Sequence, residues 1–226
     1  MHTPFTPGSR LAALPAAVVL GVLSPVLVAC GSETATQPSS AVSTAADGQE
    51  FTSADVRFLT GMIPHHAQAV AMVDLAEGRE ISSQVRSLMD EIKAAQQPEI
   101  DQMQGLLSDW GRPEVDISDP TQLMSDMSGM GDMEGMDHSG MDMEGMEGMG
   151  MDGMMSADMF SQLEKASDAD FERLWLQMMV AHHEGAVDQA EAELEQGKNP
   201  EALGLAREIV RTQTAEIETM RSLLQG

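Results

Sequence analysis

The chain has 226 residues, with 37 acidic against 12 basic side chains and a formal net charge of −25 at pH 7. This charge argues against binding to nucleic acid, or to anionic lipid surfaces through charge, and it favours cationic partners that include metal ions. A solubilising surface is the simpler explanation for most of the acidic residues. Cys30 is the only cysteine, so the chain cannot form an internal disulfide.

The N-terminal residues are typical of an export signal. Arg10 is the only strong charge at the start, and an apolar run from Leu11 to Ala29 follows, interrupted by Pro15 and Pro25. A transmembrane anchor is the alternative, but the prolines and the small residues at the end of the run favour a signal peptide. The sequence up to Cys30 reads Leu-Val-Ala-Cys, which resembles the bacterial lipoprotein box.

We therefore predict a signal peptide at residues 1–29 and a lipoprotein whose lipidated Cys30 becomes the first residue of the mature chain. Residues 30–50 are rich in Ser, Thr, Ala and Gly, and we expect them to form a flexible tether between the lipid and the domain. The protein would be held at the outer face of the cell membrane or in the periplasm.

An internal repeat organises the rest of the chain. Shifting the sequence by 117 residues aligns His65-His66 with His182-His183, and the match is interrupted only near Gly78 and Gly197. Each copy has the apolar period of an amphipathic helical hairpin, and strand signals are lacking. One such hairpin cannot bury its own apolar face, whereas two can bury theirs together. The predicted fold is therefore all-α, a four-helix bundle made of two repeated hairpins.

The predicted bundle domain spans residues 51–226, with one hairpin at 51–109, an insert at 111–155 and a second hairpin at 157–225. Capping patterns and glycines give the helix limits. We expect helices from Thr52-x-x-Asp55 to Gly78, from about Ser82 to Asp109, over Ala157–Ala166, from Ser167-x-x-Asp170 to Gly197, and from Asn199 to about Leu224.

The insert is rich in methionine. Thirteen methionines lie between Met124 and Met159, separated mostly by Gly, Asp and Glu, and no apolar period survives, so we predict a disordered segment. Thioethers in this number can wrap a soft monovalent ion, and the carboxylates would attract cations. An oxidant-scavenging surface and a linker without function are the alternatives. The secondary metal-binding candidates in the insert are His138, Met130, Met133, Met136, Met141 and Met143.

The pattern Met-x-x-His-His occurs once in each copy of the repeat. Residues three and four apart share one face of a helix, so each methionine and its two histidines form a cluster. Because the repeat relates the two helices, both clusters can approach the same level of the core. The primary metal-binding candidates are Met62, His65, His66, Met179, His182 and His183.

Two further expectations concern this level of the core. The spacing of the apolar positions predicts that His66 and His183 are the more inward of each pair. Counting back from the turns predicts Gln96 and Gln213 as hydrogen-bonding partners from the second helices. The simpler alternative is that the histidines are packed core residues and the methionines are core filler.

The residue types favour copper. Di-iron bundles use Glu-x-x-His, and here Met62 and Met179 occupy the position of that glutamate. Imidazole combined with thioether suits copper, above all Cu(I), better than iron, magnesium or calcium. Zinc can bind to the histidines but gains little from methionine, so it ranks behind copper.

The segments MIPHHAQAVAM, at residues 62–72, and MMVAHHEGAVDQA, at residues 178–190, resemble the signature of the ferritin-like family catalogued as domain of unknown function 305. The resemblance extends over residues 51–109 and 157–224, including Gln-x-x-Glu-Ile-x-x-Met at residues 96–103 and 213–220. It implies a ferritin-like bundle, an exported protein and, for some members, copper binding at the six primary candidates. The Met-rich insert departs from a compact member and leaves open whether bundle or insert is the main site.

The leading interpretation is an exported lipoprotein of copper homeostasis. It would bind Cu(I), together with Cu(II) and Ag(I), for buffering, tolerance or transfer to and from a copper-carrying protein. We expect no enzyme activity, because the sequence has neither a nucleophile with an adjacent base nor a Gly-rich phosphate loop. A ferritin-like metal-dependent oxidase and a structural surface interaction module are the alternatives.

Overall fold

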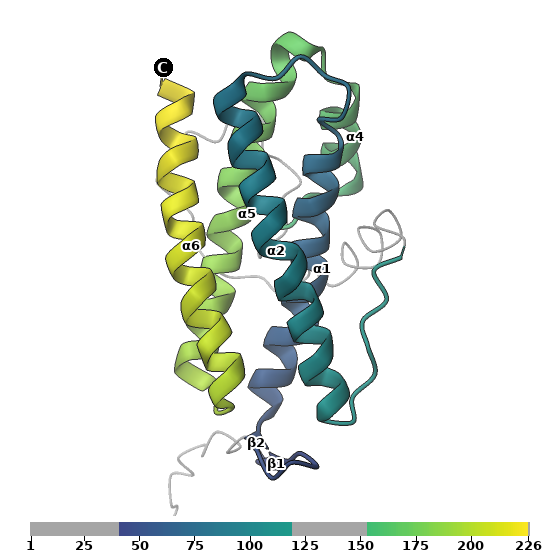
Figure 1. Cartoon of the computed structure of the whole chain (residues 1–226), viewed down its shortest axis with the longest axis vertical. Helices are drawn as coiled ribbons and strands as arrows, with labels where there is room; N and C mark the ends of the chain where they lie inside the picture. The colour runs from purple at the N-terminus through teal and green to yellow at the C-terminus, as the bar shows by residue number, and fades with distance from the viewer. Residues whose placement is uncertain (1–40, 119–152, 226) are drawn as a thin grey trace, which may run out of the picture. The chain divides into compact units, whose positions relative to one another are not determined.

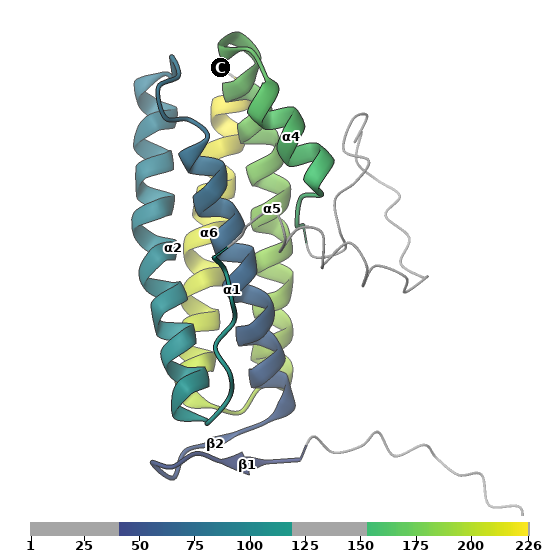
Figure 2. The same ribbon diagram turned by 90° about the vertical axis from the view of Figure 1, so that its right-hand side faces the viewer.

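The structure, a computed structural model, describes residues 41–118 and 153–225. Four long helices lie side by side in this part of the chain (Figures 1 and 2), and the predicted all-α class is confirmed. The elements are β1 (Ser43–Thr44), β2 (Glu50–Phe51), α1 (Ser53–Asp74), α2 (Ser83–Asp109), α4 (Ala157–Lys165), α5 (Asp168–Gln196) and α6 (Pro200–Gln225).

The helices form two hairpins that face each other. Helix α1 packs against α2 and α5 packs against α6, as the repeat predicts. The hairpins are joined by contacts of α1 with α5 and of α2 with α6, so the four helices enclose one core. The short helix α4 packs on α5. Among the described residues, none of the helices is long and apolar enough to cross a membrane.

The predicted caps are present at most helix starts. The Thr52 hydroxyl accepts from the backbone N–H of Asp55 (3.4 Å), and the Asp55 carboxylate accepts from the Thr52 N–H (2.6 Å). The Asn199 side chain accepts from the N–H groups of Glu201 and Ala202. Ser167 differs, because its hydroxyl donates to Asp170 instead of accepting from the backbone.

A pair of exchanged contacts ties the two hairpins together. Asp55 of α1 also accepts from the N–H groups of Lys198 (2.8 Å) and Asn199 (2.7 Å), at the start of α6. Glu172 of α5 accepts from the N–H (2.7 Å) and the hydroxyl (2.9 Å) of Ser82, at the start of α2. Asp55 and Glu172 are repeat equivalents, as are Ser82 and Asn199. The first helix of each hairpin therefore caps the second helix of the other.

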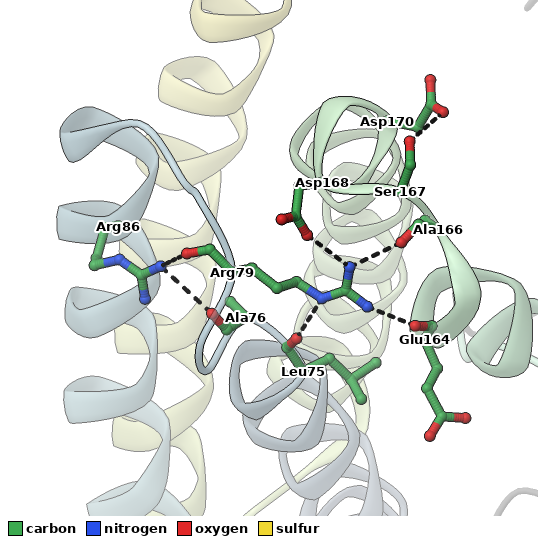
Figure 3. Close-up of polar contacts among 9 residues, drawn as sticks. All are labelled: Leu75, Ala76, Arg79, Arg86, Glu164, Ala166, Ser167, Asp168 and Asp170. Atoms are coloured by element: carbon green, nitrogen blue, oxygen red, sulfur yellow. Dashed lines mark hydrogen bonds and ion pairs between the residues drawn. The ribbon is translucent and has the colours of Figure 1, made fainter.

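The turn between α1 and α2 differs from the prediction. Helix α1 ends at Asp74, before Gly78, which lies in the turn with φ of 77°. The side chain of Arg79 fills this region: it donates to the carbonyl groups of Leu75 (2.9 Å) and Ala166 (2.8 Å) and to that of Glu164 (Figure 3). These contacts fix the turn to the start of the second hairpin, so the helix does not continue to the glycine.

Two other segments are more ordered than we predicted. The strands β1 and β2 pair antiparallel at the end of the segment expected as a tether, and Phe51, the first residue of the predicted domain, stacks on Trp110 with ring centroids 4.6 Å apart. At the end of the segment expected as a disordered insert, Met154 and Met155 are buried. Burial of these apolar side chains against the bundle outweighs the low-complexity character of the neighbouring sequence.

The apolar core is divided into two clusters. The first lies toward the β1–β2 end and the second toward the turn between α1 and α2. The first cluster includes Phe58, Leu59, Met62, Ile63, Ile100, Met103, Ala186, Ala206 and Ile209. The second cluster includes Met72, Val73, Leu88, Met89, Ile92, Trp175, Met179, Ile217 and Met220.

Candidate metal centre

A layer of buried polar side chains separates the two apolar clusters. On each long helix, the polar position lies between residues of the first cluster and residues of the second. All members are at most 2% exposed. We call this set the polar layer, and it consists of His65, His66 and Gln68 on α1, Gln96 on α2, His182 and His183 on α5, and Gln213 on α6.

The two hairpins meet in this layer through a pair of imidazoles. The ring centroids of His65 and His182 are 3.8 Å apart, with an angle of 41° between the ring planes. His182 and His183 have centroids 6.2 Å apart. The prediction that His66 and His183 are the more inward of each pair is wrong, because His65 and His182 are the residues that meet between the hairpins. All four rings are fully buried, and His65 and His182 are the two that meet across the interface of α1 and α5.

The other two histidines are each fastened to a glutamate on a second helix. His66 Nε2 lies 2.8 Å from Glu99 Oε2, and His183 Nε2 lies 2.9 Å from Glu216 Oε2. The two contacts are repeat equivalents. They replace the partners that we predicted, because the hairpin register sets the glutamates, and not Gln96 and Gln213, opposite these rings.

Gln96 and Gln213 are nevertheless buried in the polar layer. The side-chain nitrogen and oxygen of Gln96 and the oxygen of Gln213 have no hydrogen-bond partner within the described residues. The glutamates were missed although a signal existed. Gln-x-x-Glu recurs in both copies, and Glu99 and Glu216 lie one helical turn beyond the glutamines that we selected.

Several ring nitrogens of the layer are buried without a partner. Over the described part of the chain, this holds for Nδ1 of His66, Nδ1 of His183, and both nitrogens of His182 at normal hydrogen-bond geometry. Each buried unsatisfied polar atom costs about 1–3 kcal/mol. Because these unpartnered nitrogens do not stabilise the fold, they call for another explanation. An ion bound in the layer is one such explanation.

Burial also keeps His182 neutral. Desolvation lowers the pKa of His182 well below its ordinary value, and the neighbouring His65, His183 and His66 lower it further through charge repulsion. A polar contact with the backbone of His65 offsets this only in part. A neutral imidazole is the form that can bind a metal ion.

The two methionines of the repeated pattern flank the polar layer on opposite sides. Met62 and Met179 are both fully buried, and Met62 belongs to the first cluster whereas Met179 belongs to the second. Each lies one helical turn before the histidines of its own helix. The layer therefore combines imidazole nitrogens with a thioether on each side.

Within the described residues, the histidines of the polar layer do not form a ready-made group of three or more metal ligands. In residues 41–118 and 153–225, no group of three or more His, Cys, Asp or Glu side chains is arranged to hold a metal ion. The secondary candidates of the insert, His138, Met130, Met133, Met136, Met141 and Met143, and the lipidation candidate Cys30 lie outside the described residues.

The chain matches a known family. The family model described as Domain of unknown function (DUF305) matches residues 55–224, which include both hairpins, and the chain therefore belongs to this family. No curated protein matches the chain.

Solved structures of similar proteins share the fold. A DUF305 fragment from Deinococcus radiodurans is 30% identical with a TM-score of 0.59, covering 81% of this chain and 99% of that one. A DUF305 protein from Streptomyces coelicolor, named as a secreted protein, is 29% identical with a TM-score of 0.59 and coverages of 76% and 93%. CopM in its Cu(II)-bound form is 27% identical with a TM-score of 0.54 and coverages of 76% and 95%.

Proposed function

We propose that this member of the DUF305 family is an exported protein that binds copper, mainly as Cu(I), in the polar layer of its bundle. One observation carries the proposal. Four buried imidazoles from two hairpins lie at one level of the core, with unpartnered nitrogens on His66, His182 and His183. The similarity to CopM, which was solved with Cu(II) bound, supports copper over other metals.

The donor set also supports this choice of metal. Imidazole binds both oxidation states of copper, and the thioethers of Met62 and Met179 favour Cu(I). The contact between the His65 and His182 rings favours a single environment that both hairpins share. The role would be copper buffering, tolerance or transfer, with the Met-rich insert as a second binding region.

The cellular setting is part of the proposal. The signal-like N-terminus and the net charge of −25 suit an exported protein that meets cations outside the cytoplasm. We further propose that Cys30 carries a lipid that holds the protein at the membrane. The sequence around Cys30 supports this anchor.

Titration of histidine variants with Cu(I) tests the proposed site. The variants are His65→Ala with His66→Ala, His182→Ala with His183→Ala, and all four changes together. A shared site predicts that either double change removes most of the high-affinity binding, because each hairpin supplies half of the ligands. Competition with a coloured Cu(I) chelator measures the affinity, and circular dichroism checks that each variant remains helical.

The same titration distinguishes the alternatives. Loss of about half of the binding in each double variant would mean two independent sites. Unchanged high-affinity binding in the quadruple variant would show that these histidines are core residues and that the insert binds the copper. If the protein consumed oxygen catalytically with Cu(I), and the histidine changes abolished this activity, the proposed function would be wrong and the protein would be a metal oxidase.

A further inference from the structure

Two carboxylates at the edge of the polar layer have no role in the proposal above. Glu99 on α2 and Glu216 on α6 each lie at hydrogen-bond distance from Nε2 of one buried histidine, at 2.8 Å and 2.9 Å. Their side chains are only 13% and 17% exposed, so they reach from the surface into the core. The same contact occurs in both hairpins at a sequence separation of 33 residues, which makes an accidental pairing a poor explanation.

We infer that Glu99 and Glu216 are positioning residues that fasten the Nε2–H of His66 and His183 and so present Nδ1 of both rings to the metal ion. This inference rests on the proposed copper site and names the atoms that would bind there. His65 and His182, whose tilted rings contact each other, would complete the donor set from the centre of the layer.

The chemistry of the two partners determines which nitrogen remains free. An ionised carboxylate can only accept a hydrogen bond, so the imidazole nitrogen that faces it must carry the hydrogen. A neutral imidazole has one N–H, and when Nε2 carries it, Nδ1 has the free lone pair. In the described residues Nδ1 of both His66 and His183 is buried without a partner. Each ring therefore has one nitrogen held by protein and one available to a ligand.

A purely structural role for the glutamates explains less. A carboxylate that only satisfied a buried histidine would leave Nδ1 unpartnered, at a cost of about 1–3 kcal/mol for each ring. In metal sites, however, a carboxylate that accepts from the second ring nitrogen fixes the ring and raises its basicity. The negative charge beside each ring would also favour a bound cation. Both effects require the carboxylate and not merely a polar neighbour.

Nuclear magnetic resonance of the full chain, labelled with ¹⁵N in histidine, tests the assignment of the atoms. In the metal-free protein above neutral pH, we expect His66 and His183 as Nε2–H tautomers. Added Cu(I) should shift the Nδ1 resonances of these two rings while Nε2 keeps its hydrogen. Because the resonances report individual rings, copper bound by methionines elsewhere does not obscure the result.

Paired variants test the role of the carboxylates. Glu99→Ala with Glu216→Ala should weaken Cu(I) binding about 10–100-fold, the range seen when a carboxylate behind a metal-binding histidine is removed. Glu99→Gln with Glu216→Gln keeps an accepting oxygen but loses the negative charge, so this pair should preserve the Nε2–H tautomers and bind Cu(I) with an affinity between those of the parent and of the alanine pair. The matched control is Asp101→Ala with Glu218→Ala, since these residues are exposed, lie two positions further along the same helices and are repeat equivalents.

Each outcome decides the inference. Nδ1–H tautomers in the metal-free protein, a Cu(I) shift at Nε2, or alanine variants that bind as tightly as the parent would overturn it. If the parent itself shows no shift at any of the four rings, the proposed copper site fails as well. An alanine pair that loses affinity while the control pair keeps it, with Nε2–H tautomers in the parent, supports the positioning role.

Discussion

Glu193, near the end of α5, is buried beside Asp55 of α1, and the two carboxyl groups have opposite protonation at neutral pH. Burial, followed by the interaction with the nearby carboxylate of Asp55, raises the pKa of Glu193 to about 8. Burial alone would raise the pKa of Asp55 too, but hydrogen bonds from Thr52, Asn199 and Lys198 outweigh it and lower that pKa. Asp55 is thus the carboxylate and Glu193 the protonated partner.

The position of the Glu193 side chain also explains why residue 197 is a glycine. A Cβ atom at Gly197 would lie 2.2 Å from Glu193 Oε1, so a larger residue would displace the buried carboxyl group. Gly197 has a φ of −72°, so room for Glu193, and not an unusual backbone conformation, is what requires glycine here.

The free energy of unfolding of the bundle should fall as the pH rises from 4.5 to about 8. In the unfolded chain Glu193 loses its proton near its ordinary pKa of 4.5, whereas in the fold it keeps the proton until about pH 8. Between these values the unfolded state binds fewer protons, so raising the pH costs stability, by at most ~1.4 kcal/mol per pH unit.

Glu193→Gln tests this expectation, because glutamine keeps a donor toward Asp55 but does not titrate. Urea unfolding at several pH values should show a flatter profile for this variant than for the parent. Glu195→Gln, an exposed change on the same helix, controls for the loss of one negative charge. Parallel profiles for parent and Glu193→Gln would contradict the assigned protonation.

At the scale of elements, the described flanks of the insert are fastened to the bundle by two glutamine side chains. Gln104 of α2 donates to the carbonyl of Val115 (2.7 Å) and accepts from its N–H (3.0 Å). Gln68 of α1 makes the same pair of bonds with Met155, at 2.9 Å and 2.8 Å. A side-chain amide that pairs with both backbone groups of one residue acts like a short rung of β-sheet.

The second flank also lies against the polar layer. Gly153 has φ of 73°, and a Cβ there would lie 2.5 Å from the carbonyl oxygen of Ala181 and 3.1 Å from that of His182. Only glycine allows this backbone to approach α5 so closely. The end of the Met-rich segment is therefore docked beside the histidines, with Gln68 of the layer as its partner.

Replacing residues 119–152 with a flexible Gly-Ser linker should leave the bundle intact, because both flanks keep their own contacts. Circular dichroism should give the same helical signal per molecule, and unfolding should remain cooperative. Adding Gln68→Ala to this variant should lower the free energy of unfolding by about 1–3 kcal/mol, since it leaves buried backbone groups of Met155 without partners. Loss of helicity on linker replacement alone would mean that the insert belongs to the core.

At the scale of the whole molecule, charge and the proposed anchor act together. A net charge of −25 disfavours adsorption of the domain to anionic lipid through charge, so under our proposal the N-terminal segment provides the membrane attachment. The proposed lipid on Cys30 would make this attachment and would leave the acidic domain outside the cytoplasm.

Cys30→Ser should release the protein from membranes or block its processing. Fractionation of the exporting cell, followed by mass analysis of the mature N-terminus, measures both effects. Ser32→Ala, a change two residues away that keeps the thiol, should behave as the parent does. Membrane attachment that persists in Cys30→Ser would exclude the lipoprotein assignment.

Much of this protein follows from its sequence alone, because the responsible signals are local. The apolar period and the caps at Thr52 and Asn199 predict the helices, and the repeat predicts that two equivalent hairpins share one core. The repeated Met-x-x-His-His places matched donors on one face of each first helix. The helices follow from patterns over a few residues, and the shared core follows because one amphipathic hairpin cannot bury its own apolar face.

What only the tertiary structure decides is which side chains meet. The sequence does not fix the rotation of each helix about its axis or the register between hairpins, and a shift of one turn, about 5.4 Å, exchanges one partner for another. A shift of this size decides whether Glu99 or Gln96 lies opposite His66, and in the structure the partner is Glu99. Register likewise brings His65 against His182. The docking of Met155 on Gln68 depends on packing between segments 87 residues apart, which no local pattern encodes.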